Sequence, residues 1–281
     1  MLEFLLWPFL ICVVLVGIHV YFGLHVIKRG IIFVDLSLAQ IAALGTTVAF
    51  LMGYELDSDI AYLFSLGFAL MGAAVFAFTR GIKGKVPQEA VIGIAYAVSS
   101  AAAIMAVSHA PEGAEHIKYL LVGSILTVTP GIVAKTAVVY ALIGLFHIVF
   151  FRKFSALTFS HADPPKHAAL WEFLFYASFG VTVTSSVKIC GVLLVFIFLV
   201  VPSVFAVLAA TGVARHLALG WLFGLVGSAL GMWLSFHLDT PPGATIVCVF
   251  GAMLLLFAGL RKLRPSASGA QELAATDSDG T

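Results

Sequence analysis

The sequence predicts an all-α, polytopic transmembrane helical bundle of about eight or nine spans, with its N-terminus outside and its C-terminus in the cytoplasm. Hydrophobic residues make up 61% of the 281 residues and charged residues only 10%, and the mean hydropathy is +1.09. Soluble domains carry about 25% charged residues, so this composition excludes a soluble core. A span needs about 20 apolar residues, and successive windows meet that length.

Nine apolar segments are long enough to cross a bilayer. The sixth and seventh follow each other so closely that they cross either separately or as one. The first segment lacks a basic region and a cleavage site, so we interpret it as a span and not a signal peptide. Residues 1–264 form the predicted membrane domain, and the small, polar stretch 265–281 is expected to be a disordered cytoplasmic tail. The nine segments are 4–27, 31–53, 60–79, 89–108, 131–151, 170–187, 189–211, 217–237 and 243–260.

Basic residues predict the orientation. With the N-terminus outside, all but three of the 15 lysines and arginines fall in inner loops, and only Lys118, Lys135 and Lys188 lie on the outer side. This is the asymmetry expected from the positive-inside rule, and the outer segments 55–59 and 110–115 are acidic. The inner residues are Lys28, Arg29, Arg80, Lys83, Lys85, Arg152, Lys153, Lys166, Arg215, Arg261, Lys262 and Arg264.

Motifs for enzymatic chemistry are missing from the sequence. Residues 80–86 come nearest to a phosphate-binding loop but lack its spacing and its hydroxyl, and no H-E-x-x-H string occurs. Ser228 and His237 could suggest a serine protease, but a Gly-Ser pair in a glycine-rich helix is typical of helix packing. The chain is therefore not expected to be an enzyme. The three cysteines have no C-x-x-C pairing and are expected to be small buried hydrophobes: Cys12, Cys190 and Cys248.

The second predicted span carries polar residues that a membrane segment normally excludes. Asp35 and Gln40 both lie within 31–53. Translocon scales place an aspartate at a helix centre at roughly +2.5 to +3.5 kcal/mol, so such a residue usually faces a cavity, a partner or a passing substrate. His19 in the first span reaches a similar depth, roughly 12–14 Å from the inner face. We therefore take His19, Asp35 and Gln40 as a candidate open metal site.

The histidines of the spans also have simpler interpretations. His19 could donate a hydrogen bond within the bundle, because polar groups in a membrane generally pair with one another. His147 is at about the depth of Asp35, and the two could form a structural pair. His25 lies at the inner end of the first span, beside Lys28 and Arg29, and is expected at the membrane interface.

The outer loop between the fourth and fifth spans is acidic and bears imidazoles. His109, Glu112 and His116 could attract a cation at the entrance of a path through their local field. The alternative is a solvated surface, since outer loops of membrane proteins must be polar somewhere.

Four segments carry a recognisable pattern. Residues 187–210, VKICGVLLVFIFLVVPSVFAVLAA, contain a K-x-x-G-x-L-L run that ends in a proline and small residues, and residues 238–248, LDTPPGATIVC, contain a D-x-P-x-G turn. Upstream lie 86–94, VPQEAVIGI, and 119–130, YLLVGSILTVTP. Together they resemble, in the same order, the permease family of ABC importers for zinc, manganese and iron, over roughly residues 10–260.

The resemblance implies the permease subunit of an ATP-driven importer in the cell (inner) membrane. Zinc is the expected ion, with manganese and iron as alternatives, and no other cofactor and no nucleic acid is implied. The expected partners are an ATP-binding cassette ATPase on the cytoplasmic face, an extracytoplasmic metal-binding protein, a second permease chain and the lipid bilayer. Alternating access driven by ATP would move the helices that flank 31–53 and carry the metal past Asp35.

The second span departs from the family pattern, in which an aspartate is followed four residues later by a histidine. Here Gln40 stands in place of that histidine, and Asp35 precedes it by five residues. Five residues turn two side chains about 140° apart on a helix. Two alternatives therefore stay open: a self-contained carrier or channel that uses Asp35 as a proton or sodium site, and a family member whose metal site is lost.

The longest inner loop, 152–169, is basic and rich in proline. This character suits a short coupling element that docks in a groove of the ATPase, and the alternative is a plain solvated loop. The residues that we assign to the coupling loop are Ser160, His161, Asp163, Pro164 and Lys166.

Overall fold

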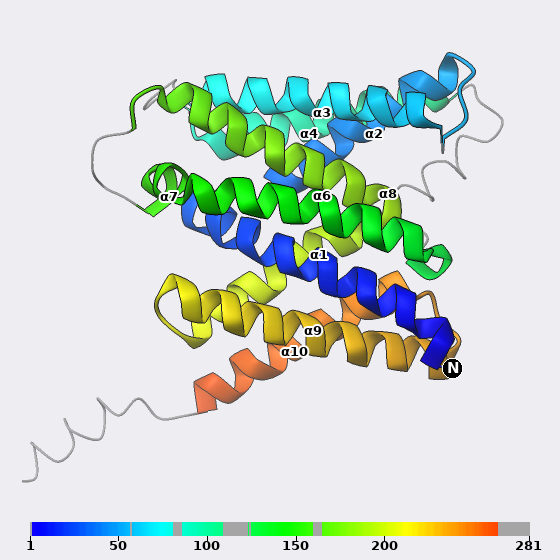
Figure 1. Ribbon diagram of the computed structural model, residues 1–281, viewed down its shortest axis with the longest axis vertical. Helices are drawn as coiled ribbons and strands as arrows, with labels where there is room; N and C mark the ends of the chain where they lie inside the picture. The colour runs from blue at the N-terminus through cyan, green and yellow to red at the C-terminus, as the bar shows by residue number, and fades with distance from the viewer. Residues whose placement is uncertain are drawn as a thin grey trace, which may run out of the picture.

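The computed structural model describes residues 2–56, 58–80, 86–108, 123, 125–159 and 165–263 (Figure 1). Eight of its helices are long and apolar enough to cross a membrane, which confirms the predicted all-α bundle. Helices satisfy their own backbone hydrogen bonds, as a bilayer requires. The elements are α1 (Leu2–Arg29), α2 (Val34–Leu51), α3 (Asp59–Thr79), α4 (Gln88–Val107), the 3₁₀ turn η1 (Ile125–Thr127), α6 (Pro130–Val149), α7 (Phe151–Phe159), α8 (Ala168–Ala209), α9 (Val213–Leu238) and α10 (Pro242–Leu263).

Helix α8 contains a sharp break. Its 42 residues would span about 63 Å if they were straight, roughly twice the hydrocarbon core of a bilayer. The backbone breaks at Gly191, where φ is 77° and ψ is 163°, a conformation that is essentially restricted to glycine. Figure 1 shows the two arms of α8 running in opposite directions across the bundle. The sixth and seventh predicted segments are thus the two arms of one bent helix.

One end of the bundle gathers the basic residues. The last turns of α1 and α3 and the first turns of α7, α8 and α9 lie at this end, on the left of Figure 1. We call it the basic end, and the opposite end the far end. This grouping follows the predicted alternation of loops, and the cytoplasmic location of the basic end stays a prediction. The lysines and arginines at this end whose side chains the structure describes are Lys28, Arg29, Arg80, Arg152, Lys153, Lys166, Arg215 and Arg261.

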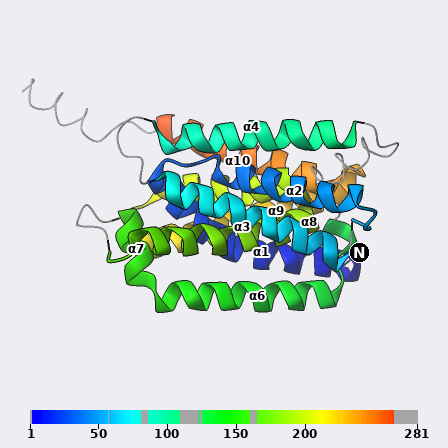
Figure 2. The same ribbon diagram turned by 90° about the horizontal axis from the view of Figure 1, so that it is seen from above.

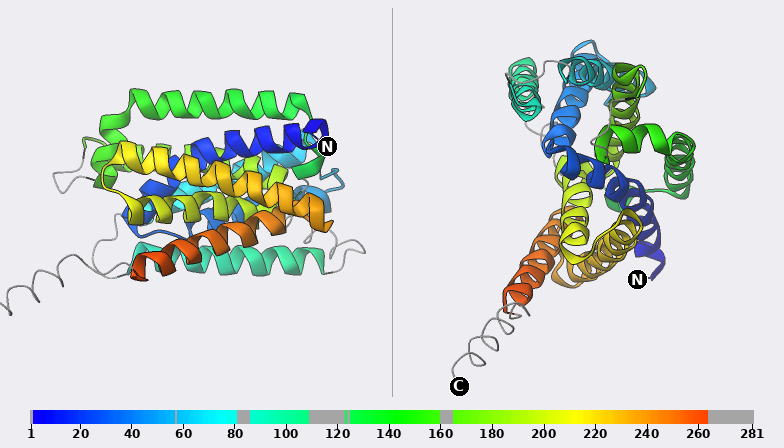
Figure 3. Two further views of the ribbon diagram at one scale, coloured as in Figure 1. Left: turned by 90° about the horizontal axis from the view of Figure 1, so that it is seen from below. Right: turned by 90° about the vertical axis from the view of Figure 1, so that its left-hand side faces the viewer.

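Helices α1 and α8 lie at the centre of the bundle. Helix α8 packs against α1, α2, α3, α9 and α10. The approach of α1 to α8 is close, because a Cβ atom added at Gly23 would lie 2.1 Å from the Leu199 carbonyl oxygen. Helices α4, α6 and α10 lie at the periphery (Figures 2 and 3) and expose apolar side chains such as Leu142 and Leu255. These helices supply the surface that we expect to face lipid.

The cysteines follow this arrangement. Cys12 and Cys190 are buried, as predicted, whereas Cys248 is exposed. The prediction for Cys248 was wrong because α10 lies at the edge of the bundle, where an apolar run has one face outside the protein.

We expect Gly191→Ala to lower the free energy of unfolding by about 1–3 kcal/mol, since a Cβ atom is strained in this backbone conformation. The measurement is thermal unfolding of the detergent-solubilised chain followed by circular dichroism. Gly17→Ala is the matched control, because a Cβ atom at Gly17 would have no neighbouring atom within 4 Å. Equal stabilities of the two variants would contradict a strained break at Gly191.

Candidate functional site

Asp35 is a buried carboxylate at the start of α2. It lies in the first turn of the helix and is 1% exposed. Its Oδ1 atom has no hydrogen-bond partner among the described residues. The positive end of the α2 dipole favours a carboxylate at this position, but a buried polar atom without a partner costs about 1–3 kcal/mol. A buried carboxylate oxygen that has no hydrogen-bond partner is suited to bind a cation.

Gln40 lies on the same helix and is half-buried. Its position five residues after Asp35 places the two side chains about 140° apart around the helix axis. It is also about 7.5 Å farther along α2, toward the far end. The two side chains therefore leave α2 on different sides and at different depths.

His19 is fully buried on α1, and both of its ring nitrogens have partners. Its Nδ1 donates to the Leu15 carbonyl oxygen at 2.7 Å, and its Nε2 lies 3.2 Å from Ser186 Oγ on α8. Ser186 in turn contacts the Tyr140 hydroxyl. This arrangement favours the hydrogen-bonding interpretation of His19 over metal ligation.

The three candidate residues lie on two helices, His19 on α1 and both Asp35 and Gln40 on α2. Helix α1 packs on α8, α9 and α6, whereas α2 packs on α3, α4 and α8. Across the described ranges, no group of three or more His, Cys, Asp or Glu side chains is arranged to hold a metal ion. The main neighbours of α1 and of α2 thus have only α8 in common.

The other two histidines of α1 and α6 differ from expectation. His147 bonds to the Tyr21 hydroxyl at 2.9 Å and to Ser178 Oγ at 2.8 Å, so the alternative of an Asp35–His147 pair was wrong. His25 was expected at the interface but is buried, and its Nδ1 lies 2.7 Å from Thr158 Oγ1. The cause is α7, which folds back over the basic end and covers this part of α1.

Sequence reasoning missed a buried ion cluster at the basic end. Arg29 Nη1 lies 2.9 Å from Glu172 Oε2, and the Arg80 guanidinium pairs with the other oxygen of the same carboxylate. Glu172 lies near the start of α8, and the arginines lie at the ends of α1 and α3. The sequence did contain a signal, because Glu172 is a carboxylate inside the predicted span 170–187, and arginines closely follow the predicted spans 4–27 and 60–79.

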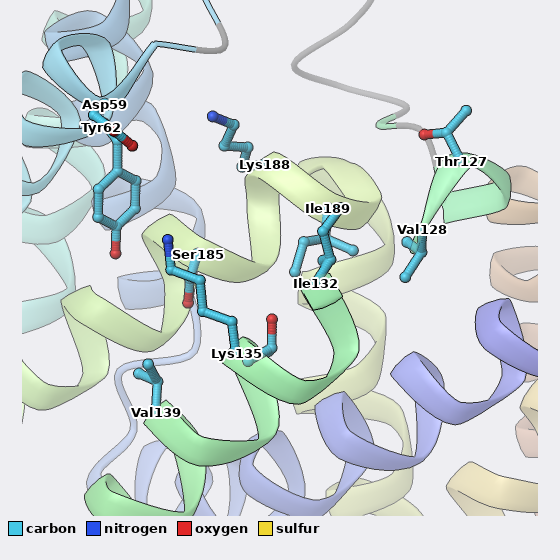
Figure 4. Close-up of a pocket in the computed structure, with 11 residues that line it drawn as sticks. Asp59, Tyr62, Thr127, Val128, Ile132, Lys135, Val139, Ser185, Lys188 and Ile189 are labelled. Atoms are coloured by element: carbon cyan, nitrogen blue, oxygen red, sulfur yellow. The ribbon is translucent and has the colours of Figure 1, made fainter. Parts of the chain in front are cut away.

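A cavity of about 470 Å³ opens between α3, α6 and α8 at the far end (Figure 4). The side chains of Lys135 and Lys188 extend into it, near Tyr62 and Asp59. Two ammonium groups would repel a metal cation by several kcal/mol at close range. This cavity is therefore a poor metal site, in spite of its size. Its remaining lining residues are Thr127, Val128, Ile132, Thr136, Val139, Ser185 and Ile189.

Most residues of the two predicted loop sites lie outside the described residues. This applies to the entrance residues His109, Glu112 and His116 and to four residues of the coupling loop, Ser160, His161, Asp163 and Pro164. Lys166 is described and is exposed just before α8.

Known proteins with a related sequence cover most of the chain. The model of the family described as the ABC 3 transport family matches residues 1–261. The manganese transport system membrane protein MntC of Listeria innocua is 22% identical over 230 residues, which are 81% of this chain and 80% of the relative. A protein of Haemophilus influenzae named "Probable iron transport system membrane protein" is 26% identical over 227 residues, with 78% and 80% covered.

A solved structure shares the architecture. PsaBC from Streptococcus pneumoniae in complex with Fab contains a chain that aligns with a TM-score of 0.73 and 20% identity, covering 90% of both chains. At this identity the likeness shows a common fold and leaves the substrate to be argued from the site.

We expect Asp35→Asn to raise the thermal stability of the isolated chain, because the change removes a buried negative charge and keeps the shape of the side chain. The gain should be about 1–3 kcal/mol. Thermal unfolding in detergent measures it, with the exposed Asp59→Asn as the control. A loss of stability would indicate that Asp35 is paired in the folded chain.

Proposed function

The chain belongs to the ABC 3 transport family, and from this premise we propose that it is the membrane permease subunit of an ATP-driven importer for a divalent metal ion. Two of its relatives are named for the transport of manganese and iron. The observation that carries the proposal is the buried Asp35, with an oxygen atom that has no hydrogen-bond partner in the described chain. Intramembrane carboxylates of this kind commonly mark ion pathways.

The pathway that we propose runs along α2. An ion that enters from the far end reaches the depth of Gln40 first, and it meets Asp35 about 7.5 Å nearer the basic end and about 140° around the axis of α2. Two separate oxygen donors along a helix bind an ion weakly at each step, which allows it to leave again. The second permease copy that the resemblance implies would bring a further α2 to the path.

Manganese or iron fits these donors better than zinc. Asp35 offers carboxylate oxygens and Gln40 an amide oxygen, and such ligands suit Mn²⁺. Imidazole suits zinc, but both nitrogens of His19 are engaged within the bundle. The sequence-based expectation of zinc thus requires His19 to leave Ser186, and it stays a prediction for the uptake experiment.

Helix α7 offers a surface for the proposed ATPase partner. Its Phe154 is buried and stacks on His147 at a centroid distance of 4.1 Å. Its other side forms a surface depression of about 440 Å³ lined by Phe151, Arg152, Ser155, Ala156 and Phe159. A short helix with one face anchored in the bundle and the other exposed at the basic end suits a docking element. Movement of the ATPase subunits would then drive alternating access through α7.

We expect Asp35→Asn to lower uptake of the transported metal about tenfold or more, because it removes one charged ligand from the path. The measurement is elemental analysis of manganese, iron and zinc in cells that lack this chain and are complemented with each variant. Asp239→Asn is a matched control, since Asp239 is exposed and its left-handed backbone, with φ 52°, suits asparagine.

Membrane levels of both variants should equal those of the wild type. Normal uptake by Asp35→Asn would remove Asp35 from the path. Uptake that survives ATP depletion but falls when the membrane potential is dissipated would favour the self-contained carrier.

We expect the double variant Arg152→Glu and Lys153→Glu to reduce co-purification of the ATPase subunit at least severalfold, because it reverses the charge of the exposed side of α7. Affinity purification followed by immunoblotting measures the ratio of the two subunits. Arg215→Glu is the control, since Arg215 is also exposed at the basic end but lies on α9. Equal reduction by the control would assign the effect to overall charge and not to α7.

A further inference from the structure

Two arginines fasten the C-terminal part of α7 to the bundle. Arg29, the last residue of α1, donates through Nε to Thr158 Oγ1 at 2.8 Å and through Nη1 to Glu172 at 2.9 Å. Arg80 follows α3 and donates through Nη2 to the Leu157 carbonyl oxygen at 3.0 Å, while its Nη1 bonds to Glu172. Each arginine therefore links α7 to the carboxylate of α8. We call Arg29, Arg80 and Glu172 the basic-end clamp.

The clamp is largely withdrawn from solvent. The exposed side-chain fractions are 2% for Arg29 and 6% for Glu172, against 31% for Arg80. The guanidinium carbon of Arg29 also lies 3.9 Å from the centroid of the Phe175 ring. Charge-assisted hydrogen bonds strengthen in such a low-dielectric site, and a buried carboxylate shared by two cations is held in a defined position.

Helix α3 connects the clamp to the helix that carries Asp35. It packs along α2, where Ser65 Oγ donates to the Ala42 carbonyl oxygen at 3.0 Å. The contact is tight, because a Cβ atom added at Gly45 would lie 2.6 Å from the Phe64 carbonyl oxygen. A displacement of α7 that pulls on Arg80 would thus move α3 and α2 together.

We propose that the basic-end clamp transmits displacement of α7 to α3, and through α3 to the Asp35-bearing helix α2. This inference rests on the proposed function, and it assigns Arg29, Arg80 and Glu172 as positioning residues for transport. Within the described ranges, none of the three bonds to Asp35 Oδ1. Their contribution is to keep the docking helix and the ion-binding helix mechanically connected.

The test uses Arg80→Gln, which breaks the link between α7 and α3 and leaves the buried Arg29–Glu172 pair in place. Arg215→Gln is the matched control, as an exposed arginine of the same end. Removal of Glu172 is less informative, because two arginines would lose their carboxylate and the chain could unfold.

The first readout needs only the permease. Spin labels at Lys153→Cys on α7 and Met71→Cys on α3, both exposed positions, report the distance between the helices in lipid nanodiscs after the exposed Cys248 is replaced by serine. We expect Arg80→Gln to broaden this distance distribution and Arg215→Gln to leave it unchanged. An unchanged distribution in Arg80→Gln would overturn the clamp.

The second readout is metal uptake per ATP hydrolysed, in vesicles that contain the chain and its co-purifying ATPase. We expect Arg80→Gln to lower this ratio about tenfold at unchanged ATPase binding, which matches the loss of charge-assisted hydrogen bonds. A purely structural role would instead lower the amount of assembled complex and leave the ratio intact, and that result would overturn the proposal. If the wild-type chain binds no ATPase, the proposed function fails, and the distance readout still decides whether the clamp connects α7 to α3.

Discussion

A charged side chain inside an apolar bundle is stable only when it is paired, and the arrangement of this chain depends on that constraint. Glu172 satisfies it with two arginines from the ends of α1 and α3. The buried histidines satisfy the related need of polar groups through hydroxyl and carbonyl partners on neighbouring helices. Asp35 departs from the pattern, since its Oδ1 atom has no hydrogen-bond partner in the described ranges. The bundle thus stabilises its charges at the basic end and holds a destabilising one where an ion is proposed to pass.

The two carboxylates differ in role because of their positions. Glu172 lies where α1, α3, α7 and α8 meet, so its neighbours supply cations and its bonds fix helices to one another. Asp35 lies at the start of α2, where the helix dipole gives partial compensation without a side-chain partner. In the proposed function, this partial compensation would leave the carboxylate available for a cation and keep the binding weak enough for release. The proposed function therefore assigns helix-to-helix attachment to Glu172 and ion binding to Asp35.

Composition and the lengths of the apolar segments were sufficient to predict the spans, because a bilayer imposes the length and polarity of each helix. They did not predict that the segments around Gly191 form one bent helix. The break depends on a positive φ angle, which a glycine can adopt but which its presence in a sequence does not predict. Helix α7 was not predicted because its nine residues are too few for a span. Its position over the basic end depends on tertiary contacts, which the local sequence does not predict. The burial of His25 and the pairing of Glu172 follow from that return. The number of residues from the inner helix ends placed His19 and Gln40 at a similar depth in the membrane. It carries no information on which helices are neighbours, and α1 packs mainly on α8, α9 and α6.

The most direct test of the account is transport by the purified system. Vesicles would contain this chain and its ATPase subunit, with ATP supplied on the side of the membrane that the basic end faces. Accumulation of Mn²⁺ on that same side would be followed without any imposed ion gradient. The account predicts accumulation that requires ATP hydrolysis and the presence of both subunits. Accumulation by this chain alone, driven by a proton or sodium gradient and indifferent to ATP, would contradict it.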